Sequence, residues 1–388
     1  MSTVQLGELV TIKGGGTPSR ENPAYWGGSI PWASVKDFKT ASISTTKETI
    51  TEAGLRNSAA NLIPAGAIIV PTRMAVGKAA INTIPVAINQ DLKALLPKPG
   101  IEARFLLHLL LDRGPDIERR ATGATVKGIT LDVLRELEVV LPDEAEQKRI
   151  ADILDEADAL RAKRREALAT LDEMARAIFT AMFGTLEPGA TNYSSVPFDT
   201  IVSDSRIGLV RAATEVGAEH PHSYIKMDAI TREGGLDLTR STRTFATASE
   251  VADFSLADGD FLFNTRNSRE LVGKSAIFRS DKTALFNNNL MRIRFRDGVE
   301  AEYVLAAMRT PALKQGLENR KSGTTSVYAI YWKDLRTLPV PLPPVEQQKA
   351  FAMRMKEVQK MRDVMRRAMD HLDSLFAALQ HRAFRGEL

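Results

Sequence analysis

The sequence has 388 residues and contains no cysteine. This absence excludes a disulfide framework, thiolate catalysis and zinc held by thiolates. Long apolar runs are also missing: no stretch approaches the roughly 18 apolar residues of a membrane span, so none is expected. The start of the chain lacks a basic segment followed by an apolar one, which speaks against a secretory signal and favours a cytoplasmic protein.

Catalytic and metal-binding patterns are missing as well. The five histidines form no metal-ligand spacing, and His108 is expected in the core or at the rim of an apolar helix. Gly273-Lys274-Ser275 resembles the end of a phosphate-binding loop, but Ser268 stands where that loop needs its first glycine. An Asn-Pro-Pro-aromatic element is absent too, which excludes an ordinary amino-methyltransferase. We therefore expect no catalytic residue, metal or cofactor in this chain.

The charge is nearly balanced, with 52 basic and 48 acidic residues and a net charge of +4. Proteins that wrap nucleic acid without sequence preference are usually far more basic. If this chain binds DNA, its basic groups must be gathered locally and its acidic groups must face elsewhere.

What the sequence does contain is an internal repeat. Leu-Pro-Asp-Glu-Ala-Glu-Gln-Lys at 141–148 matches Leu-Pro-Pro-Val-Glu-Gln-Gln-Lys at 342–349, and the same offset continues without a gap to the end of both copies. Upstream, Asn-Gln-Asp-Leu at 89–92 matches Asn-Asn-Asn-Leu at 287–290. Such order-preserving similarity indicates a duplicated unit.

Each copy begins with a region of mixed character. Short apolar runs after a glycine, at 67–70 and 260–263, predict buried strands. Segments 103–111 and 301–308 predict helices. The many Gly, Pro, Asn and Ser residues elsewhere predict loops. The predicted class is α+β.

Each copy ends in a stretch of roughly 40 residues without Pro or Gly, which predicts a helix about 60 Å long. Both helices carry a heptad pattern, and we call its positions the seam. The first-helix seam is Leu154, Ala157, Arg161, Arg164, Leu168, Leu171, Ala175, Ile178 and Met182. The second-helix seam is Met355, Val358, Arg362, Met365, Met369, Leu372, Phe376, Leu379 and Ala383.

A period of 3.5 residues favours left-handed coiled-coil packing. The first helix delivers the chain to the second domain, so a second helix packed on the first must run back antiparallel. Arg161, Arg164 and Arg362 lie in the seam, where polar residues commonly fix register. The alternative is that each helix folds back onto its own domain.

The acidic residues at the start of the first helix superficially suggest a metal-dependent nuclease. They lie within two turns of one helix, however, whereas such a site gathers its ligands from separate strands. Asp143 followed by Glu146 predicts a capping box instead.

Two sets of polar loop residues recur in both copies and suit DNA contacts. Arg can bridge guanine O6 and N7, Asn can pair with adenine, and Lys with Thr can hold phosphates. The first set follows the buried strand of each copy, with Arg73 and Lys78 in one copy and Arg266, Asn267, Arg269 and Lys274 in the other. The second set is Arg119, Arg120, Thr125 and Lys127, matched by Arg320, Lys321, Thr324 and Thr325. The candidate DNA-contacting residues are Thr17, Arg20, Lys36, Arg73, Lys78, Thr125, Lys127, Lys226, Arg266, Asn267, Arg269, Lys274, Thr324 and Thr325. Ordinary solvated charge is the competing interpretation.

With these features, the sequence resembles the specificity subunits of type I restriction–modification systems. The most specific sign is Leu-Pro-Pro-x-Glu-Gln-Gln-Lys at 342–349 with its weaker copy at 141–148. Gly15-Gly16-Thr17-Pro18, Ile30-Pro31-Trp32 and the segment 66–73 support it. The second domain departs from the pattern, with Asp-Ser-Arg-Ile-Gly at 204–208 in place of Gly-Gly-Thr-Pro.

The resemblance implies two target-recognition domains, at 1–142 and 185–343, and two spacer helices, at 143–184 and 344–388. Each domain would read one half of a split sequence in double-stranded DNA. The helix pair would set the spacing and dock two modification subunits that bind S-adenosylmethionine and methylate adenine. Restriction subunits that use ATP and magnesium would join this core. The alternative of a different class is a duplicated protein-binding scaffold without DNA recognition, and a third is an enzyme with an unrecognised active site.

Overall fold

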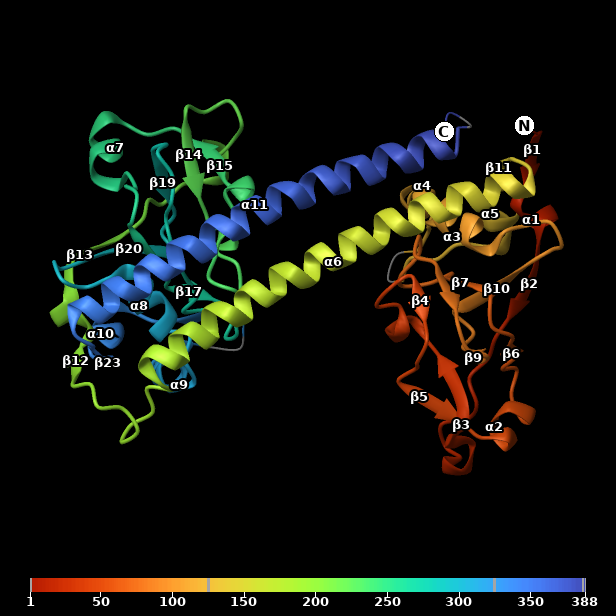
Figure 1. Ribbon diagram of the computed structural model, residues 1–388, viewed down its shortest axis with the longest axis horizontal. Coiled ribbons are helices and arrows are strands. Elements are labelled where there is room, and N and C mark those ends of the chain that lie inside the picture. Colours follow the sequence, from red (N-terminus) through yellow and green to blue (C-terminus); the bar gives the residue numbers. More distant parts are fainter. Residues whose placement is uncertain (1, 124–125, 324–325, 386, 388) are drawn as a thin grey trace. The chain divides into compact units, whose positions relative to one another are not determined.

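The computed structural model describes the chain except residues 1, 124–125, 324–325, 386 and 388. It divides into two compact units, Met1–Arg165 with Arg367–Leu388 and Glu166–Arg366. Each unit combines a globular part with a segment of each of two long helices, α6 (Glu144–Phe183) and α11 (Val345–Ala383) (Figure 1). Among the described residues, no helix has the length and apolar character needed to cross a membrane.

The first unit contains two larger sheets. Its five-stranded sheet has the order β2-β10-β7-β8-β4, its four-stranded sheet the order β5-β3-β9-β6, and β1 pairs with β11. The bounds are β1 (Ser2–Gln5), β2 (Val10–Gly14), β3 (Trp26–Ala33), β4 (Ser42–Ile43), β5 (Glu48–Ile50), β6 (Leu62–Ile63), β7 (Ile68–Pro71), β8 (Ala80–Asn82), β9 (Val86–Ile88), β10 (Leu92–Pro97) and β11 (Glu138–Leu141). β7 is buried along its whole length and confirms the strand predicted at 67–70.

One helix of this unit, α3, covers the larger sheet. The helices are α1 (Leu6–Leu9), α2 (Glu52–Arg56), α3 (Ala103–Asp112), α4 (Gly114–Arg119) and α5 (Leu131–Arg135), with 3-10 turns η1 (Pro23–Tyr25) and η2 (Val35–Asp37). α3 confirms the helix predicted at 103–111. Phe105, Leu106, Leu109 and Leu110 share one helical face and are buried in the core with Ile68 of β7. Burying each of these side chains contributes about 2 kcal/mol.

The second unit has a related set of sheets. Their orders are β13-β20-β16-β18, β15-β14-β19 and β17-β22-β21, and β12 pairs with β23. The bounds are β12 (Ser195–Pro197), β13 (Val202–Ile207), β14 (His222–Ile225), β15 (Thr242–Thr244), β16 (Phe261–Asn264), β17 (Arg266–Asn267), β18 (Ser275–Ile277), β19 (Ala284–Phe286), β20 (Leu290–Phe295), β21 (Ser322–Gly323), β22 (Tyr328–Ala329) and β23 (Pro339–Pro341). β16 is the strand predicted at 260–263.

The helices of the second unit follow the same sequence of elements. They are α7 (Ala248–Phe254), α8 (Ala301–Ala307), α9 (Pro311–Glu318) and α10 (Trp332–Leu335), with η3 (Phe198–Ile201), η4 (Ala213–Glu215), η5 (Met227–Ala229) and η6 (Leu238–Arg240). α8 confirms the helix predicted at 301–308. Gly77 and Gly273 have φ angles of 89° and 88° at matching positions after β7 and β16, a conformation that favours glycine. Both units mix helices with sheets, as predicted from the sequence.

In the first unit, the beginning of α6 and the end of α11 share one apolar core. Leu154 of α6 is fully buried there with Phe376 of α11, and the Phe384 ring lies 5.5 Å from that of Phe105. Arg161 Nε lies 2.6 Å from Asp373 Oδ1, and its guanidinium lies 4.3 Å from the centroid of the Phe376 ring. Both helix segments are therefore integral parts of this unit.

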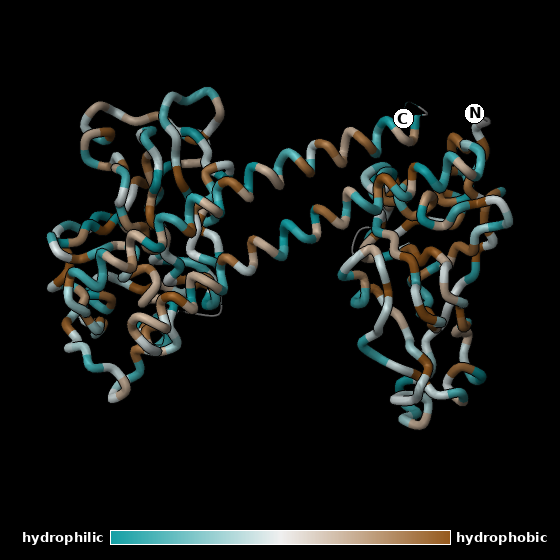
Figure 2. The backbone as a smooth tube through the Cα atoms, in the orientation of Figure 1, coloured by the Kyte–Doolittle hydropathy of each residue, from teal (hydrophilic) through white to brown (hydrophobic). Residues whose placement is uncertain are grey.

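In the second unit, the end of α6 meets the beginning of α11. Phe179 and Phe183 pack against Phe351, with ring centroids 5.5 Å apart in both pairs. Arg362 donates a hydrogen bond to Asp172 across the two helices. Polar and apolar residues alternate along both helices in Figure 2, as a heptad pattern requires.

Most seam positions are buried or half-buried, but Arg164 is exposed. The prediction that this arginine lies in the seam is therefore wrong. Arg161 and Arg362 differ from it because each pairs with an aspartate of the other helix, which offsets the cost of partly burying the charge.

The repeated Leu-Pro motif places a buried glutamine at the start of each long helix. Gln147 Oε1 accepts from Glu102 N at 2.9 Å, and its Nε2 donates to Pro142 O at 3.0 Å. Gln348 repeats both bonds, from Glu300 N at 3.1 Å and to Pro343 O at 2.8 Å. The motif thus joins each long helix to the globular part before it by satisfying backbone groups that would otherwise be buried without partners.

The predicted capping box at the start of α6 is only half formed. Asp143 Oδ1 accepts from Glu146 N at 2.9 Å, as predicted. The Glu146 carboxylate pairs with Arg149 Nε and Nη2, both at 2.7 Å, and not with the backbone at Asp143. The expectation of a reciprocal box is wrong because an arginine one turn further on offers a charged, bidentate partner.

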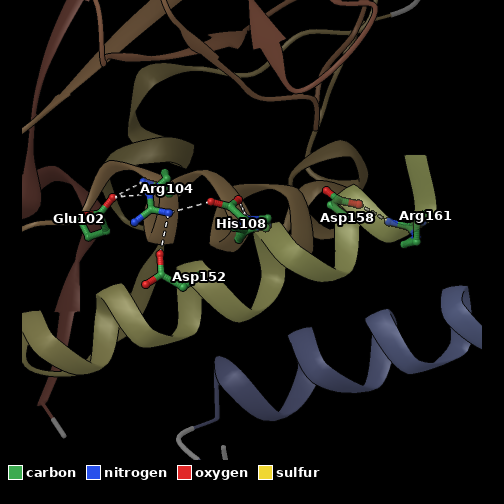
Figure 3. A network of polar contacts seen from close by, with 7 residues as sticks. Glu102, Arg104, His108, Asp152, Asp158 and Arg161 are labelled. Atoms are coloured by element: carbon green, nitrogen blue, oxygen red, sulfur yellow. Dashed lines mark hydrogen bonds and ion pairs between the residues drawn. The ribbon is translucent and has the colours of Figure 1, made fainter. Parts of the chain in front are cut away.

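A polar network joins α3 to α6 in the first unit (Figure 3). Arg104 Nη1 lies 2.8 Å from Asp152 Oδ1 and 2.9 Å from Asp155 Oδ2. His108, only 2 % exposed, lies with Nε2 2.7 Å from Asp155 Oδ1. His108 is therefore a core residue, as the sequence predicted, and its polar partner is Asp155.

Candidate nucleic-acid interface

Close backbone packing fixes the first polar loop of each unit. A Cβ on Gly15 would lie 2.1 Å from Ile88 O, and one on Gly208 would lie 2.3 Å from Phe286 O, so only glycine fits at either place. The loop that follows is held by an aromatic donor. Trp32 Nε1 donates to Gly16 O at 3.0 Å, and Tyr224 OH donates to Leu209 O at 2.8 Å. Gly208 therefore performs the structural role of Gly15 although the surrounding sequence differs.

In the first unit this loop carries Thr17 and Arg20. Thr17 donates to Gln90 in the turn between β9 and β10. Arg20 pairs with Glu48, with Nη2 3.0 Å from Oε2, and its guanidinium lies 3.6 Å from the centroid of the Trp26 ring. The hydrogen bond from Arg20 lowers the pKa of Glu48 below its usual value. The cation predicted to contact DNA is thus oriented by a carboxylate and an aromatic ring.

Lys36 is exposed in the η2 turn, which a buried aspartate holds in place. Asp37 Oδ2 accepts from Ser34 N and its Oδ1 accepts from Lys47 N, both at 2.8 Å. The charge of Lys36 also contributes to lowering the pKa of Glu48. Lys36 and Arg20 therefore lie in one electrostatic neighbourhood.

The second predicted cluster of this unit is brought together by backbone pairing. Arg73 forms an isolated bridge with Gly128, and Met74 N donates to Lys127 O at 3.3 Å. Arg73 and Lys127 are both exposed, and so is Lys78 further along the same loop. Two segments far apart in the sequence thus contribute basic side chains to one edge.

Lys93 was missed by sequence reasoning and connects the two clusters. Its Nζ donates to Gln90 O at 2.8 Å, next to the residue that Thr17 contacts. Burial is the main cause that lowers the pKa of Lys93, and the nearby positive charge of Arg73 adds to it. A lysine on a strand gives no signal in a single sequence, because its neighbours come from other loops.

In the second unit, Arg266 and Asn267 form strand β17, which pairs with β22. Asn267 Nδ2 donates to Asn264 Oδ1 at 2.9 Å. Arg269 Nε lies 2.7 Å from Glu318 Oε1, and its guanidinium lies 5.7 Å from the centroid of the Tyr328 ring. Arg266 is exposed and its side chain forms no hydrogen bond or ion pair within the described parts of the chain, so its guanidinium is available to an outside partner.

The two predicted lysines of this unit have different environments. Lys274 Nζ donates to Ile230 O at 2.5 Å, and burial lowers its pKa. Lys274 therefore stabilises the turn that follows β14 by a hydrogen bond within the domain. Lys226 begins that turn, before η5, and lines a cavity with Arg211 and Asn287.

Three predicted contacts, Thr125, Thr324 and Thr325, lie outside the described residues. Arg320, considered with them, donates to the carbonyl oxygens of Gly316, Asp334 and Thr337 at 2.8 to 3.0 Å. Its guanidinium is thus occupied within the domain. Among the described residues there is no group of three or more His, Cys, Asp or Glu placed to hold a metal ion.

Comparisons with known proteins give a consistent family relationship. Residues 1–170 match the model of the type I restriction modification DNA specificity domain. The chain is 37 % identical over 162 residues to the type I restriction enzyme EcoR124I/EcoR124II specificity subunit of Escherichia coli, which is 40 % of each protein. It is 30 % identical over 192 residues to the MjaIX specificity subunit of Methanocaldococcus jannaschii, covering 47 % of this chain and 44 % of the relative.

A third relative matches over more of the length. The chain is 25 % identical over 341 residues to the EcoKI specificity subunit of Escherichia coli, covering 82 % of this chain and 73 % of that protein. The matches to the first two relatives span less than half of their length.

Among solved structures, the type I restriction-modification S subunit from M. genitalium has the same fold. It aligns with a TM-score of 0.56 and 15 % identity over 99 % of this chain and 96 % of its own. These comparisons confirm the family resemblance predicted from the sequence.

Proposed function

We propose that the whole chain is a non-catalytic DNA sequence-specificity subunit, because residues 1–170 match the model of the type I restriction modification DNA specificity domain. Each unit reads one half of a bipartite site in double-stranded DNA. One observation carries the proposal: in each unit the segment after β7 or β16, which bears Arg73 or Arg266, pairs with a second segment far along the chain.

The long helices set the spacing between the two readers as an antiparallel coiled coil. In support, the beginning of α6 meets the end of α11 in one unit, and the end of α6 meets the beginning of α11 in the other. The half-sites then lie on one face of the duplex, about one helical turn or 34 Å apart. Two methyltransferase subunits dock on the helix pair, and restriction subunits join this core. S-adenosylmethionine, ATP and magnesium are bound by those partners.

Salt dependence of binding by the full chain tests the proposal. Duplexes from a randomised pool are titrated with the chain at increasing salt. Specific DNA binding is expected to weaken steeply, since each phosphate contact releases counterions. Binding to no duplex, or binding that ignores salt, contradicts the proposal and favours a protein-binding scaffold.

The half-site assignment is tested by Arg73→Ala and Arg266→Ala. If each arginine reads a base, its removal costs roughly 1–3 kcal/mol and relaxes discrimination in one half-site only. Selection of preferred sequences for each variant provides the measurement. A uniform loss across all sequences identifies a phosphate contact instead.

The ruler role is tested by deleting one heptad from each long helix. The expected result is a changed gap between the half-sites in the selected sequences, or loss of specific binding. An unchanged gap contradicts the role of the helix pair.

A further inference from the structure

A polar cavity of about 440 Å³ lies in the second unit beside the loop that follows β13. Its polar lining comes from Arg211, Tyr224, Lys226 and the three asparagines of the turn between β19 and β20. Its volume is within the range of sites that bind small organic groups. No described residue of the lining is acidic, so the cavity suits a group that is negatively charged or rich in acceptors.

One asparagine of this turn, Asn287, is buried without a partner. It is 8 % exposed, and its Oδ1 accepts no hydrogen bond within the described parts of the chain. Burying such an oxygen without a donor costs about 1–3 kcal/mol. The side chain lines the cavity, so a bound group can supply the missing partner.

The equivalent asparagine of the first unit has no such vacancy. Asn89 and Asn287 make the same backbone bonds, from their own N to Ala33 O and to Ile225 O. Asn89 Oδ1, however, accepts from Asp91 N at 3.2 Å. The turn of the first unit is therefore closed upon itself.

The side chains next to these asparagines are also hydrogen-bonded to each other in the first unit but not in the second. In the first unit Thr17 donates to Gln90 and ties the first loop to the turn. The second unit has Val210, which is 70 % exposed, and Asn288 at these places. Valine cannot donate a hydrogen bond, so this side-chain tie is missing and the cavity lies between the two segments.

Two cations line the cavity, and they have different roles. Arg211 Nη2 lies 2.8 Å from Glu250 Oε1, and its Nε donates to Phe245 O at 3.1 Å. The Arg211 guanidinium is therefore occupied by contacts within the domain. Lys226 Nζ forms no bond among the described residues and is only partly buried, so its charge is available to a ligand.

Building on the proposed function, we infer that this cavity is a base-reading subsite in which Asn287 pairs with the N6 and N7 edge of an adenine and Lys226 contacts a neighbouring phosphate. A carboxamide offers one donor beside one acceptor. Adenine alone presents an adjacent acceptor and donor on its major-groove edge, whereas guanine presents two acceptors and cytosine one donor. Lysine is a point charge with three donors and suits phosphate.

The test uses the full chain and a duplex selected from a randomised pool. Each adenine in turn is replaced by 7-deazaadenine, which lacks the N7 acceptor. At one adenine of one half-site, affinity of the unaltered protein is expected to fall on the order of tenfold. Asn287→Asp keeps the shape but has no donor for N7, so this variant is expected to be insensitive to that replacement.

Two further variants test which unit reads the adenine and what Lys226 contacts. Asn89→Asp, at the matching place in the first unit, is expected to keep the sensitivity at that adenine. Lys226→Ala is expected to weaken binding to all sequences alike and to reduce the slope of affinity against salt by about 1.

The outcomes separate this inference from the proposed function. If specific, salt-dependent binding persists but no adenine is sensitive to 7-deazaadenine, the subsite assignment is wrong and the proposed function stands. Sensitivity that survives in Asn287→Asp also overturns the assignment. A chain that binds no duplex refutes both. If Asn287→Asp does not fold, the deazaadenine series on the unaltered protein still overturns the inference when no adenine is sensitive, and Asn287→Ser, which is also expected to be insensitive, replaces the variant.

Discussion

The two units keep the same backbone bonds but differ in the side chains that occupy their polar edges. Thr72 N donates to Asp91 O at 2.7 Å, and Thr265 N donates to Asn289 O at 2.9 Å. The Oγ1 atoms of both threonines donate to the same two carbonyl oxygens at 3.0 Å. Around these fixed points, Arg20 of the first unit is paired and stacked, whereas the second unit has a cavity with an unpartnered Asn287. The scaffold is thus held by main-chain groups, which leaves the side chains free to vary with the sequence that is read.

The largest effect is expected where main chains approach most closely. Gly15→Ala and Gly208→Ala should each lower the free energy of unfolding by about 3 kcal/mol, because a carbonyl oxygen occupies the place of the new Cβ. Urea titration provides the measurement. Gly14→Ala is the control, since its Cβ would meet only Lys93 Nζ at 3.9 Å. Tolerance of alanine at one of the two sites would break the equivalence of the units.

A smaller effect is expected at the buried glutamines. Gln147→Leu and Gln348→Leu should each cost about 2 kcal/mol, because the N–H groups of Glu102 and Glu300 lose their acceptor. The exposed neighbour Gln347 is the matched control. Its Oε1 accepts from Tyr193 OH at 2.9 Å, but water can replace this exposed bond, so its change to Leu should cost less, about 0.5–1 kcal/mol. Similar losses for both buried residues are expected in urea titrations. A large loss in only one unit would show that the other joins its helix by different contacts.

The sequence predicted the parts that depend on local pattern. Heptad spacing without Pro or Gly located α6 and α11, and a glycine before an apolar run located β7 and β16. The repeat also aligns Asn89 with Asn287. Such features are visible because their cause lies within a few neighbouring residues.

Side-chain roles at the candidate site were less predictable. Lys274 resembles Lys78 in the repeat, yet Lys274 is held inside by Ile230 O while Lys78 is exposed. Trp32 and Tyr224 share a role without sharing a residue type. In these cases the partner comes from a distant segment, so a single sequence carries no signal for it.

An effect of intermediate size on stability is expected in the helix pair. Asp172→Asn removes the negative charge opposite Arg362, whose other partner among the described residues is the neutral Gln359, at 3.0 Å, and should cost about 1 kcal/mol. Asp373→Asn leaves Arg161 beside Asp158, at 2.6 Å, and should cost less than about 0.5 kcal/mol. Thermal unfolding at low and high salt checks both, and high salt should reduce the difference. Equal losses would mean that Asp158 does not compensate.

The smallest effect distinguishes two arginines that both lie over an aromatic ring. Arg20→Lys should cost about 0.5 kcal/mol, because lysine loses the paired hydrogen bonds to Glu48 and the close stacking on Trp26. Arg269→Lys should produce no measurable change, since its ring lies 5.7 Å away and its ion pair is exposed. Thermal unfolding of the two variants side by side provides the measurement. A larger shift for Arg269→Lys would mean that the polar edge of the second unit is the more rigid one, which its cavity and unpartnered asparagine argue against.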